Sequence, residues 1–272
     1  MNNLHATAVV DSKARLGADV IVGPYSIIER DVEIGDGCVI GPHVVLRRYT
    51  TLGPACRVHA GAVLGEPAQD LGFKEVPTYV RIGRGCTIRE GVTIHRATQP
   101  EMATEVGDGV FLMVQSHIAH DAHVGAHTII ANATLLGGHV HIGERAFLSA
   151  HVLVHQFVRI GRLAMVAGAS GISQDVPPFC TTRPMTVNTL LGVNRIGIKR
   201  AGLTVVERNE IKRAFELLYR SDLNAVQAVA RIRGELSAGP AGELADFVAA
   251  SRRGCCQLRA DRASPTTDTA EF

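Results

Sequence analysis

A six-residue repeat of aliphatic side chains runs through the first two thirds of the chain and restricts the folds that it can adopt. From Val10 to Ile172, every sixth residue is aliphatic at 26 of 28 positions, and only Asp70 and Pro100 interrupt the series. A period of six fits neither a helix nor an isolated strand, but it suits short strands joined by tight corners and stacked coil on coil. The repeat therefore predicts a solenoid with an aliphatic core.

Three hexads make one triangular coil of 18 residues, with the aliphatic side chain directed toward the axis. In this repeat the chain resembles the hexapeptide-repeat proteins, which form left-handed parallel β-helices and usually trimerise. We take the handedness from that resemblance, because the general crossover rule would favour a right-handed connection. A coiled coil is excluded by the period, and a transmembrane chain is excluded because no apolar run approaches the roughly 18 residues needed.

The pattern divides the chain into three predicted segments. Residues 1–190 form the left-handed parallel β-helix of an all-β repeat fold, and residues 191–253 form a C-terminal α-helical domain. The last segment, residues 254–272, is expected to be a disordered tail. The hexads lapse at residues 66–77 and 96–105, which we interpret as loops, and loops on a rigid scaffold often carry function.

Helical spacing replaces the hexads from about Ile196, where Ile211, Phe215 and Leu218 share one face. Ser221 and Asp222 are candidate caps for a following helix. Beyond that helix, Gly239-Pro240 interrupts the chain before a last helix predicted over residues 243–251.

Composition gives a location and excludes some partners. The first residues lack the basic and apolar segments of a signal peptide, so we expect a cytoplasmic protein without membrane insertion. A net charge of +2 gives no indication of nucleic acid binding. The six cysteines form no paired metal or redox motif, and the adjacent Cys255 and Cys256 are expected to be exposed.

Basic residues gather in the helical segment. Residues 195–220 contain seven Lys or Arg against three Glu. A basic helical surface suits an acidic protein partner, and a simply solvated face is an equally good explanation.

Histidines, which are candidate catalytic or binding residues, are concentrated in one segment. Eight of the twelve lie between His117 and His155. Residues 18 apart stack on neighbouring coils, about 4.8 Å apart. This spacing predicts one column made of His120, Gly138 and Gln156, and beside it a second column made of Asp121, His139 and Phe157, with His155 adjacent.

Three interpretations of this polar patch are open. A metal site is disfavoured, although His and Asp are ligand types, because the spacing is not that of a zinc-binding helix and no thiolate assists, so we predict neither metal nor cofactor. Simple corner filling is the favoured interpretation for His123, His127, His141 and His151. For His120 we favour a general base, since Asp121 can hold its tautomer and a backbone N–H can receive an oxyanion. No Ser or Cys stands beside this base, which favours direct transfer over a covalent acyl-enzyme.

At these residues the chain resembles the UDP-N-acetylglucosamine O-acyltransferases that begin lipid A synthesis. The resemblance extends from about residue 4 to residue 253, and a related N-acyltransferase is disfavoured because it typically has Asn where this chain has Asp121. The shared motifs, in the family's order, are GEPAQDLG (65–72), IREGVTIHR (88–96), HIAHDAHVG (117–125), ANATLLGGHV (131–140), VHQFVRIG (154–161), GISQDVPPF (171–179), GVNRIGIKR (192–200) and LLYRS (217–221).

The resemblance implies a role for each matching residue. His120 would take the proton from the glucosamine 3-hydroxyl, Asp121 would orient it, and the N–H of Gly138 would hold the thioester oxyanion. Gly168 falls where the family sets acyl length and leaves room for a longer 3-hydroxyacyl chain. The remaining matches are expected to bind substrate: Gln69, Asp70 and His95, then His117, His139, His155 and Gln156 around the sugar, nucleotide and pantetheine arm, and Arg200 in the phosphate region.

Counted in hexads, His95 lies on a different side of the prism from His120, which is consistent with a cleft shared between subunits. Two positions depart from the family pattern. Gly72 stands where a lysine is common, with Lys74 nearby, and Ala201 stands where a second arginine often follows. Both concern nucleotide and carrier binding rather than the base.

The sequence therefore predicts a homotrimeric, metal-independent acyltransferase that moves a 3-hydroxyacyl group from acyl carrier protein to UDP-N-acetylglucosamine. Three alternatives remain: a 3-amino sugar acceptor, a coenzyme A donor, or a non-catalytic trimeric scaffold of the same fold.

Overall fold

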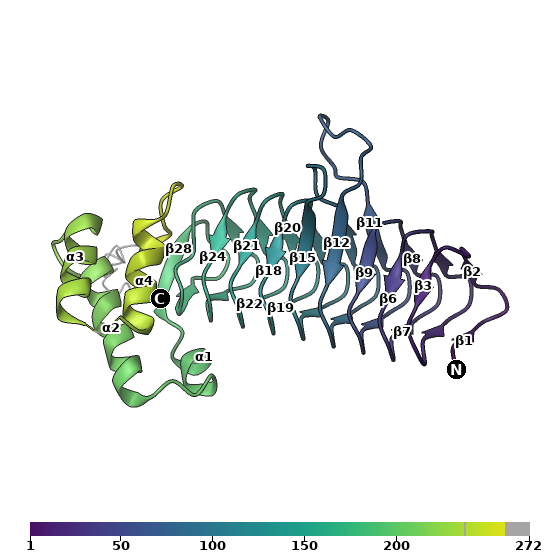
Figure 1. Cartoon of the computed structure of the whole chain (residues 1–272). Helices are drawn as coiled ribbons and strands as arrows, with labels where there is room; N and C mark the ends of the chain where they lie inside the picture. The colour runs from purple at the N-terminus through teal and green to yellow at the C-terminus, as the bar shows by residue number, and fades with distance from the viewer. Residues whose placement is uncertain (237, 259–272) are drawn as a thin grey trace, which may run out of the picture.

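The computed structural model describes residues 1–236 and 238–258, and it is a long prism of stacked coils that ends in a group of helices (Figure 1). The prism is the predicted left-handed parallel β-helix, with one sheet on each of three faces. Side chains 18 residues apart are in register, as Ile27 is with Val45. The amide of Val9 donates to the carbonyl of Ser26 at 2.8 Å, and this pattern repeats from coil to coil.

The three sheets are named A, B and C here, and their strands are given in spatial order. Sheet A contains β1 (Asn3–Leu4), β4 (Ile21–Val22), β7 (Val39–Ile40), β10 (Arg57–Val58), β13 (Thr87–Ile88), β16 (Phe111–Leu112), β19 (Ile129–Ile130), β22 (Phe147–Leu148), β25 (Met165–Val166), β27 (Cys180–Thr182), β28 (Thr189–Val193) and β29 (Gln257–Leu258). Sheet B contains β2 (Val9–Val10), β5 (Ile27–Ile28), β8 (Val45–Leu46), β11 (Val63–Glu66), β14 (Thr93–His95), β17 (His117–Ile118), β20 (Leu135–Leu136), β23 (Leu153–Val154) and β26 (Gly171–Ile172). Sheet C contains β3 (Arg15–Leu16), β6 (Glu33–Ile34), β9 (Thr50–Leu52), β12 (Tyr79–Ile82), β15 (Ala103–Val106), β18 (His123–Val124), β21 (His141–Ile142) and β24 (Arg159–Ile160).

The aliphatic residue of each hexad points into the prism. Leu46, Leu64, Leu112 and Leu148 are each 0% exposed, and burying such a side chain contributes roughly 1.5–3 kcal/mol. Glycine follows where the next coil comes too close for a side chain: a Cβ on Gly143 would lie 2.4 Å from the backbone nitrogen of Arg162.

Two loops leave the β-helix at one corner, between sheets B and C (Figure 1). The first occupies residues 67–78, between β11 and β12, and the second occupies residues 96–102, between β14 and β15. The second loop is shorter than predicted, because residues 103–105 pair with β12 as part of β15.

The prediction that His95 lies on another side of the prism was wrong. Ile94 and Val106 are 12 residues apart where a regular corner needs six, so the second loop inserts six residues and shifts the hexad count by one face. Ile94 pairs with Ile118, and His95 therefore lies in sheet B, one coil before His117.

Within residues 1–236 and 238–258, four helices follow the β-helix: α1 (Arg195–Arg200), α2 (Val205–Tyr219), α3 (Ala225–Glu235) and α4 (Pro240–Ala249). The last of them begins three residues earlier than predicted, with Pro240 in its first turn. Among the described residues, none of the helices combines the length and apolar character needed to cross a membrane.

The predicted cap of α3 was also wrong. Asn224 caps this helix, because its side chain accepts from the amide of Gln227 at 3.0 Å and the Gln227 side chain accepts from the Asn224 amide in return. Ser221 instead donates to the carbonyl of Leu217, at the end of α2.

The start of the predicted disordered tail is ordered. Gln257 and Leu258 form β29 and pair with Thr189 and Leu190 of β28, which draws the preceding residues into the interior. Cys255 and Cys256, expected to be exposed, are therefore buried, with 6% and 0% exposure. The rest of the predicted tail, residues 259–272, lies outside the described residues.

A buried carboxylate joins the helices to the β-helix. Asp175 is 1% exposed and accepts from the amide of Arg159 at 2.8 Å, from its Nε at 3.1 Å and from Ser251 Oγ at 2.9 Å. The same arginine donates to the carbonyl of Phe247 in α4. This network fixes the last helix against the final coil.

Candidate active site

His120 and Asp121 form the corner between β17 and β18, directly below the two loops. His120 Nδ1 lies 2.8 Å from Asp121 Oδ2, and each side chain is only 10% exposed. The carboxylate accepts the Nδ1 proton, so the lone pair of a neutral imidazole is on Nε2. This arrangement is that of an oriented general base.

The second loop supplies further donors to Asp121. The amide of Thr98 lies 3.1 Å from both carboxylate oxygens, and its Oγ1 donates to Oδ2 at 2.8 Å. The Asp121 amide itself donates to Thr104. Burial alone would raise the pKa of Asp121, but the hydrogen bonds from His120 and Thr98 outweigh it and hold that pKa below the ordinary value.

The Nε2 side of His120 faces a glycine one coil away, as the predicted column requires. A Cβ on Gly138 would lie 2.5 Å from His120 Cε1 and 2.7 Å from Nε2, so a side chain here would displace the imidazole. His139 approaches from the side, with its ring 5.3 Å from that of His120 and stacked at 4.5 Å on Phe157.

The backbone amide of Gly138 makes no hydrogen bond within the described residues. At the same position of other coils, an aspartate on the next coil accepts this amide, as Asp36 does for Ala18 at 2.7 Å and Asp108 for Arg84 at 2.9 Å. Gln156 occupies the aspartate position here, which leaves the Gly138 N–H available to an oxyanion.

A groove with a volume of about 620 Å³ runs along this corner and sheet B. Its lining contains six of the predicted site residues beside an apolar strip. The predicted site residues are Gln69, His117, His120, Gly138, His155 and Gln156, and the strip includes Leu135, Leu153, Gly171 and Val187. Such a lining fits a polar acceptor beside an acyl chain.

Burial keeps His117, in the groove, and the neighbouring His95 neutral. Burial, with the neighbouring His95 and His120, lowers the pKa of His117 to about 4. Burial also lowers the pKa of His95, whose Nδ1 donates to the carbonyl of Pro67 at 2.8 Å. Both side chains can therefore act as neutral hydrogen-bonding groups near pH 7.

Other predicted residues lie apart from the groove. Asp70 turns back to accept from the amide of Gly72 at 2.7 Å, within the first loop. Gly168 lies at the opposite corner of sheet B, and Arg200 ends α1. A single chain therefore does not bring these three residues to His120.

A metal remains chemically possible at one point. Ligand atoms of His120, Asp121 and His139 lie within 4.8 Å of one another. Asp121 Oδ2 already accepts hydrogen bonds from His120 and Thr98, which compete with metal coordination.

The motifs of the sequence identified neither Thr98 nor Arg253 as site residues. Thr98 lies in a predicted loop, but no spacing rule relates a loop residue to Asp121. Arg253 contacts His155 from 98 residues away, and it is the last residue of the predicted helical domain. Only the three-dimensional structure could identify either contact.

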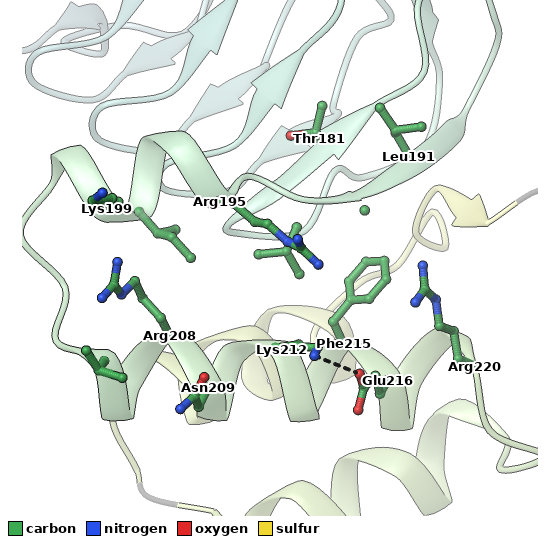
Figure 2. A pocket seen from close by; sticks show the side chains of 14 residues that line it. Thr181, Leu191, Arg195, Lys199, Arg208, Asn209, Lys212, Phe215, Glu216 and Arg220 are labelled. Atoms are coloured by element: carbon green, nitrogen blue, oxygen red, sulfur yellow. Dashed lines mark ion pairs between the residues drawn. The ribbon is translucent and has the colours of Figure 1, made fainter.

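A second cavity, of about 600 Å³, lies between α1, α2 and β28. Figure 2 shows Arg195 and Arg208 directed toward the space between the two helices, with Lys199 on α1 and Arg220 at the other end of α2. Lys212 is 3.9 Å from Glu216, which neutralises part of the charge. The cavity lies in the basic segment recognised in the sequence.

Comparison with known proteins agrees with these features. The family described as Udp N-acetylglucosamine O-acyltransferase, Domain 2, matches residues 175–256, and the bacterial transferase hexapeptide family matches residues 13–48. An acyl-(acyl-carrier-protein)–UDP-N-acetylglucosamine O-acyltransferase from Halorhodospira halophila is 46% identical over 93% of this chain and 99% of its own length. One from Thermodesulfovibrio yellowstonii is 40% identical over 94% and 100%.

Solved structures give the same result. The UDP-N-acetylglucosamine acyltransferase LpxA from Bacteroides fragilis superposes with a TM-score of 0.88 at 33% identity, covering 92% of this chain and 98% of its own. LpxA from Acinetobacter baumannii gives 0.87 at 35% identity, with 94% and 99% coverage. The chain therefore belongs to the acyl-(acyl-carrier-protein)–UDP-N-acetylglucosamine O-acyltransferase family.

Proposed function

We propose that this protein transfers a 3-hydroxyacyl group from acyl carrier protein to the 3-position of UDP-N-acetylglucosamine, the first step of lipid A biosynthesis. The names of its relatives support the substrates. The observation that carries the chemistry is the His120–Asp121 pair, whose free Nε2 faces a groove lined by polar and apolar residues.

His120 acts as the general base. Its Nε2 removes the proton from the 3-hydroxyl as that oxygen attacks the thioester carbonyl, and the resulting imidazolium is stabilised by Asp121. Collapse of the tetrahedral intermediate breaks the carbon–sulfur bond, and the leaving thiolate takes the proton back from His120. Among the described residues, no Ser or Cys hydrogen-bonds to His120, which supports direct transfer without an acyl-enzyme.

The Gly138 N–H stabilises the tetrahedral oxyanion. It lies one coil from His120 and has no protein acceptor within the described residues. A preorganised donor of this kind contributes on the order of 10²–10³ to a rate.

The polar and the apolar lining of the groove receive different parts of the substrates. Gln69, His117, His155 and Gln156 bind the sugar, nucleotide and pantetheine groups, and the strip with Leu135 and Leu153 receives the acyl chain. His95 and His139 also bind near the sugar, since their rings lie beside those of His117 and His120 at the groove. The remaining assignments lie away from this groove and depend on a neighbouring subunit: Asp70 near the sugar, Gly168 at the end of the acyl chain and Arg200 near the phosphates.

The basic cavity between α1 and α2 is the docking surface for the acidic carrier protein. Arg195, Lys199, Arg208 and Arg220 line it, and charge complementarity of this kind accelerates association. The protein works as a cytoplasmic homotrimer, in keeping with its resemblance to hexapeptide acyltransferases.

A transfer assay tests the reaction. The purified protein is incubated with UDP-N-acetylglucosamine and 3-hydroxyacyl carrier proteins of several chain lengths, beside the matching coenzyme A thioesters and a 3-amino acceptor. We expect turnover with the carrier protein and the 3-hydroxyl acceptor, and a trimer by light scattering. Turnover only with the coenzyme A thioesters would show that the donor is coenzyme A, and turnover only with the amine would show that the acceptor is a 3-amino sugar. A folded protein inactive with every pair would indicate a scaffold.

A further inference from the structure

Arg253 reaches the rim of the active-site groove from the segment that follows α4. Its Nη2 lies 3.2 Å from His155 Nδ1, and its Nε donates to the carbonyl oxygen of Ser173 at 3.1 Å. His155 and Ser173 both line the groove. A cationic side chain thus contacts a predicted substrate-binding histidine, and no role described above uses it.

The backbone that follows Arg253 is fixed. The amide of Asp175 donates to the carbonyl of Gly254 at 2.9 Å, and the amide of Cys256 donates to the carbonyl of Asp175 at 2.8 Å. Cys256 is 0% exposed, and the chain continues into β29. Arg253 therefore extends from an anchored segment rather than from a free end.

The contact bears on the tautomer of His155. Nδ1 has two close neighbours, Arg253 Nη2 at 3.2 Å and the carbonyl oxygen of Gln156 at 3.1 Å. They require opposite states of Nδ1, because a guanidinium only donates and a carbonyl only accepts. The charged donor makes the stronger hydrogen bond, so Nδ1 accepts from Arg253 and the imidazole proton is on Nε2.

We propose that Arg253 is a positioning residue that keeps His155 in the Nε2–H tautomer, so that this histidine offers the groove a hydrogen-bond donor. The donor suits a carbonyl or phosphate oxygen of bound substrate. Without Arg253, Nδ1 can keep the proton and donate to the Gln156 carbonyl. Nε2 would then direct its lone pair toward the same substrate oxygen, and the hydrogen bond between them would be replaced by repulsion between two lone pairs.

The inference rests on the proposed function, and variants at three positions test it kinetically. Arg253→Ala should lower kcat/KM about 10–100-fold, chiefly through KM for the substrate that meets His155, as expected for losing a well-placed hydrogen bond. Arg253→Lys should recover most of this loss, since an ammonium also donates to Nδ1. Arg252→Ala is the matched control, because it removes the same charge from an exposed neighbouring side chain.

A double-mutant cycle separates action through His155 from direct action. We expect His155→Ala and the His155→Ala/Arg253→Ala double variant to have the same kcat/KM. If Arg253→Ala lowers the rate by the same factor in both backgrounds, or matches Arg252→Ala, the proposal is wrong. Equal melting temperatures for the variants, or rescue by Arg253→Lys, exclude loosening of the segment as the cause.

A readout independent of turnover distinguishes this proposal from the proposed function. In protein labelled with ¹⁵N-histidine, the imidazole shifts of His155 should report the Nε2–H tautomer in wild type and a shift toward Nδ1–H in Arg253→Ala. An inactive wild type with this tautomer change would overturn only the function. An active wild type whose His155 tautomer is unaffected by Arg253→Ala would overturn only the inference.

Discussion

The corner between sheets B and C has the same backbone conformation in different coils but carries different side chains. In a coil before the loops it carries Arg30 and Asp31, whose side chains are 52% and 43% exposed and 3.9 Å apart. In the coil after the loops the same two positions carry His120 and Asp121, each 10% exposed and 2.8 Å apart. The backbone is alike, since φ is 61° at Asp31 and 58° at Asp121. The coil is therefore a scaffold, and burial by the loops converts a surface pair into a reactive one.

The loops can cover His120 and Asp121 because they leave the β-helix at that same corner. Thr98 of the second loop donates to Asp121, and Gln69 of the first loop lines the groove. Arg96, 2% exposed, fixes the first loop by donating to Glu75 at 2.9 Å. Exposed pairs such as Arg30–Asp31 contribute little, whereas a dyad removed from water has strong electrostatic effects.

The largest expected contrast is between Asp121→Asn and Asp31→Asn. Asp121→Asn should reduce kcat by about 10²–10⁴, because the amide cannot stabilise the imidazolium or hold the tautomer. Asp31→Asn should leave kcat unchanged and alter the free energy of unfolding by less than about 0.5 kcal/mol. Steady-state kinetics and denaturant titration measure both. Equal losses of activity would show that the two corners are not distinct.

Gly138→Ala should reduce kcat by about 100-fold or more, because the added Cβ displaces the His120 ring and crowds the oxyanion position. Arg30→Ala, in the same column before the loops, is the control and should be fully active. An active Gly138→Ala variant would exclude the amide from the oxyanion site.

Core substitutions should erase the difference between the two regions. Leu46 and Leu148 are both 0% exposed, on opposite sides of the loops. Leu46→Ala and Leu148→Ala should each cost about 2–5 kcal/mol of unfolding free energy, since each leaves a cavity in the same aliphatic core. Chemical denaturation with activity retained in the folded fraction would support a uniform scaffold. A cost confined to one region would contradict it.

Thr98→Ala should reduce activity about tenfold, the effect of one hydrogen bond to a charged group. Thr98 contributes to the lowered pKa of Asp121, so its loss raises that pKa and strengthens the attraction for the His120 proton. The acidic limb of the pH–rate profile should therefore move to higher pH. A pH–rate profile that keeps its position would show that Thr98 does not influence the His120–Asp121 pair.

The last prediction concerns stability and pH. The pKa of His117 is about 4 in the folded chain against an ordinary 6.5, so only the unfolded chain takes up the proton between these values. Stability should fall as the pH decreases from about 6.5 to about 4, and the fall should be shallower in His117→Gln. Melting temperatures across this range test it, and parallel curves would contradict the assignment.

The hexads predicted most of the fold because each coil obeys one local rule. The columns of His120 with Gly138 and of Asp121 with His139 followed from the same 18-residue spacing. Counting hexads gave the wrong face for His95. The second loop inserts six residues at a corner, which shifts the count by one face while every sixth residue stays in phase.

Contacts made outside the repeat were not accessible from the sequence. The cap of α3 was misplaced because Ser221 and Asn224 are both good cap residues, and only the hydrogen bonds distinguish them. The burial of Cys255 and Cys256 depends on pairing with Asp175 and β28, far away in the sequence. Arg253 reaches His155 through that same pairing.

The most direct test of the account is single-turnover transfer from 3-hydroxyacyl carrier protein to UDP-N-acetylglucosamine by wild type and His120→Ala. The account predicts rapid transfer by the wild type and a loss of roughly 10²–10⁴ in the variant, with unchanged folding and assembly. Comparable transfer by both proteins, or a folded wild type that transfers nothing, would contradict a His120 base at this corner.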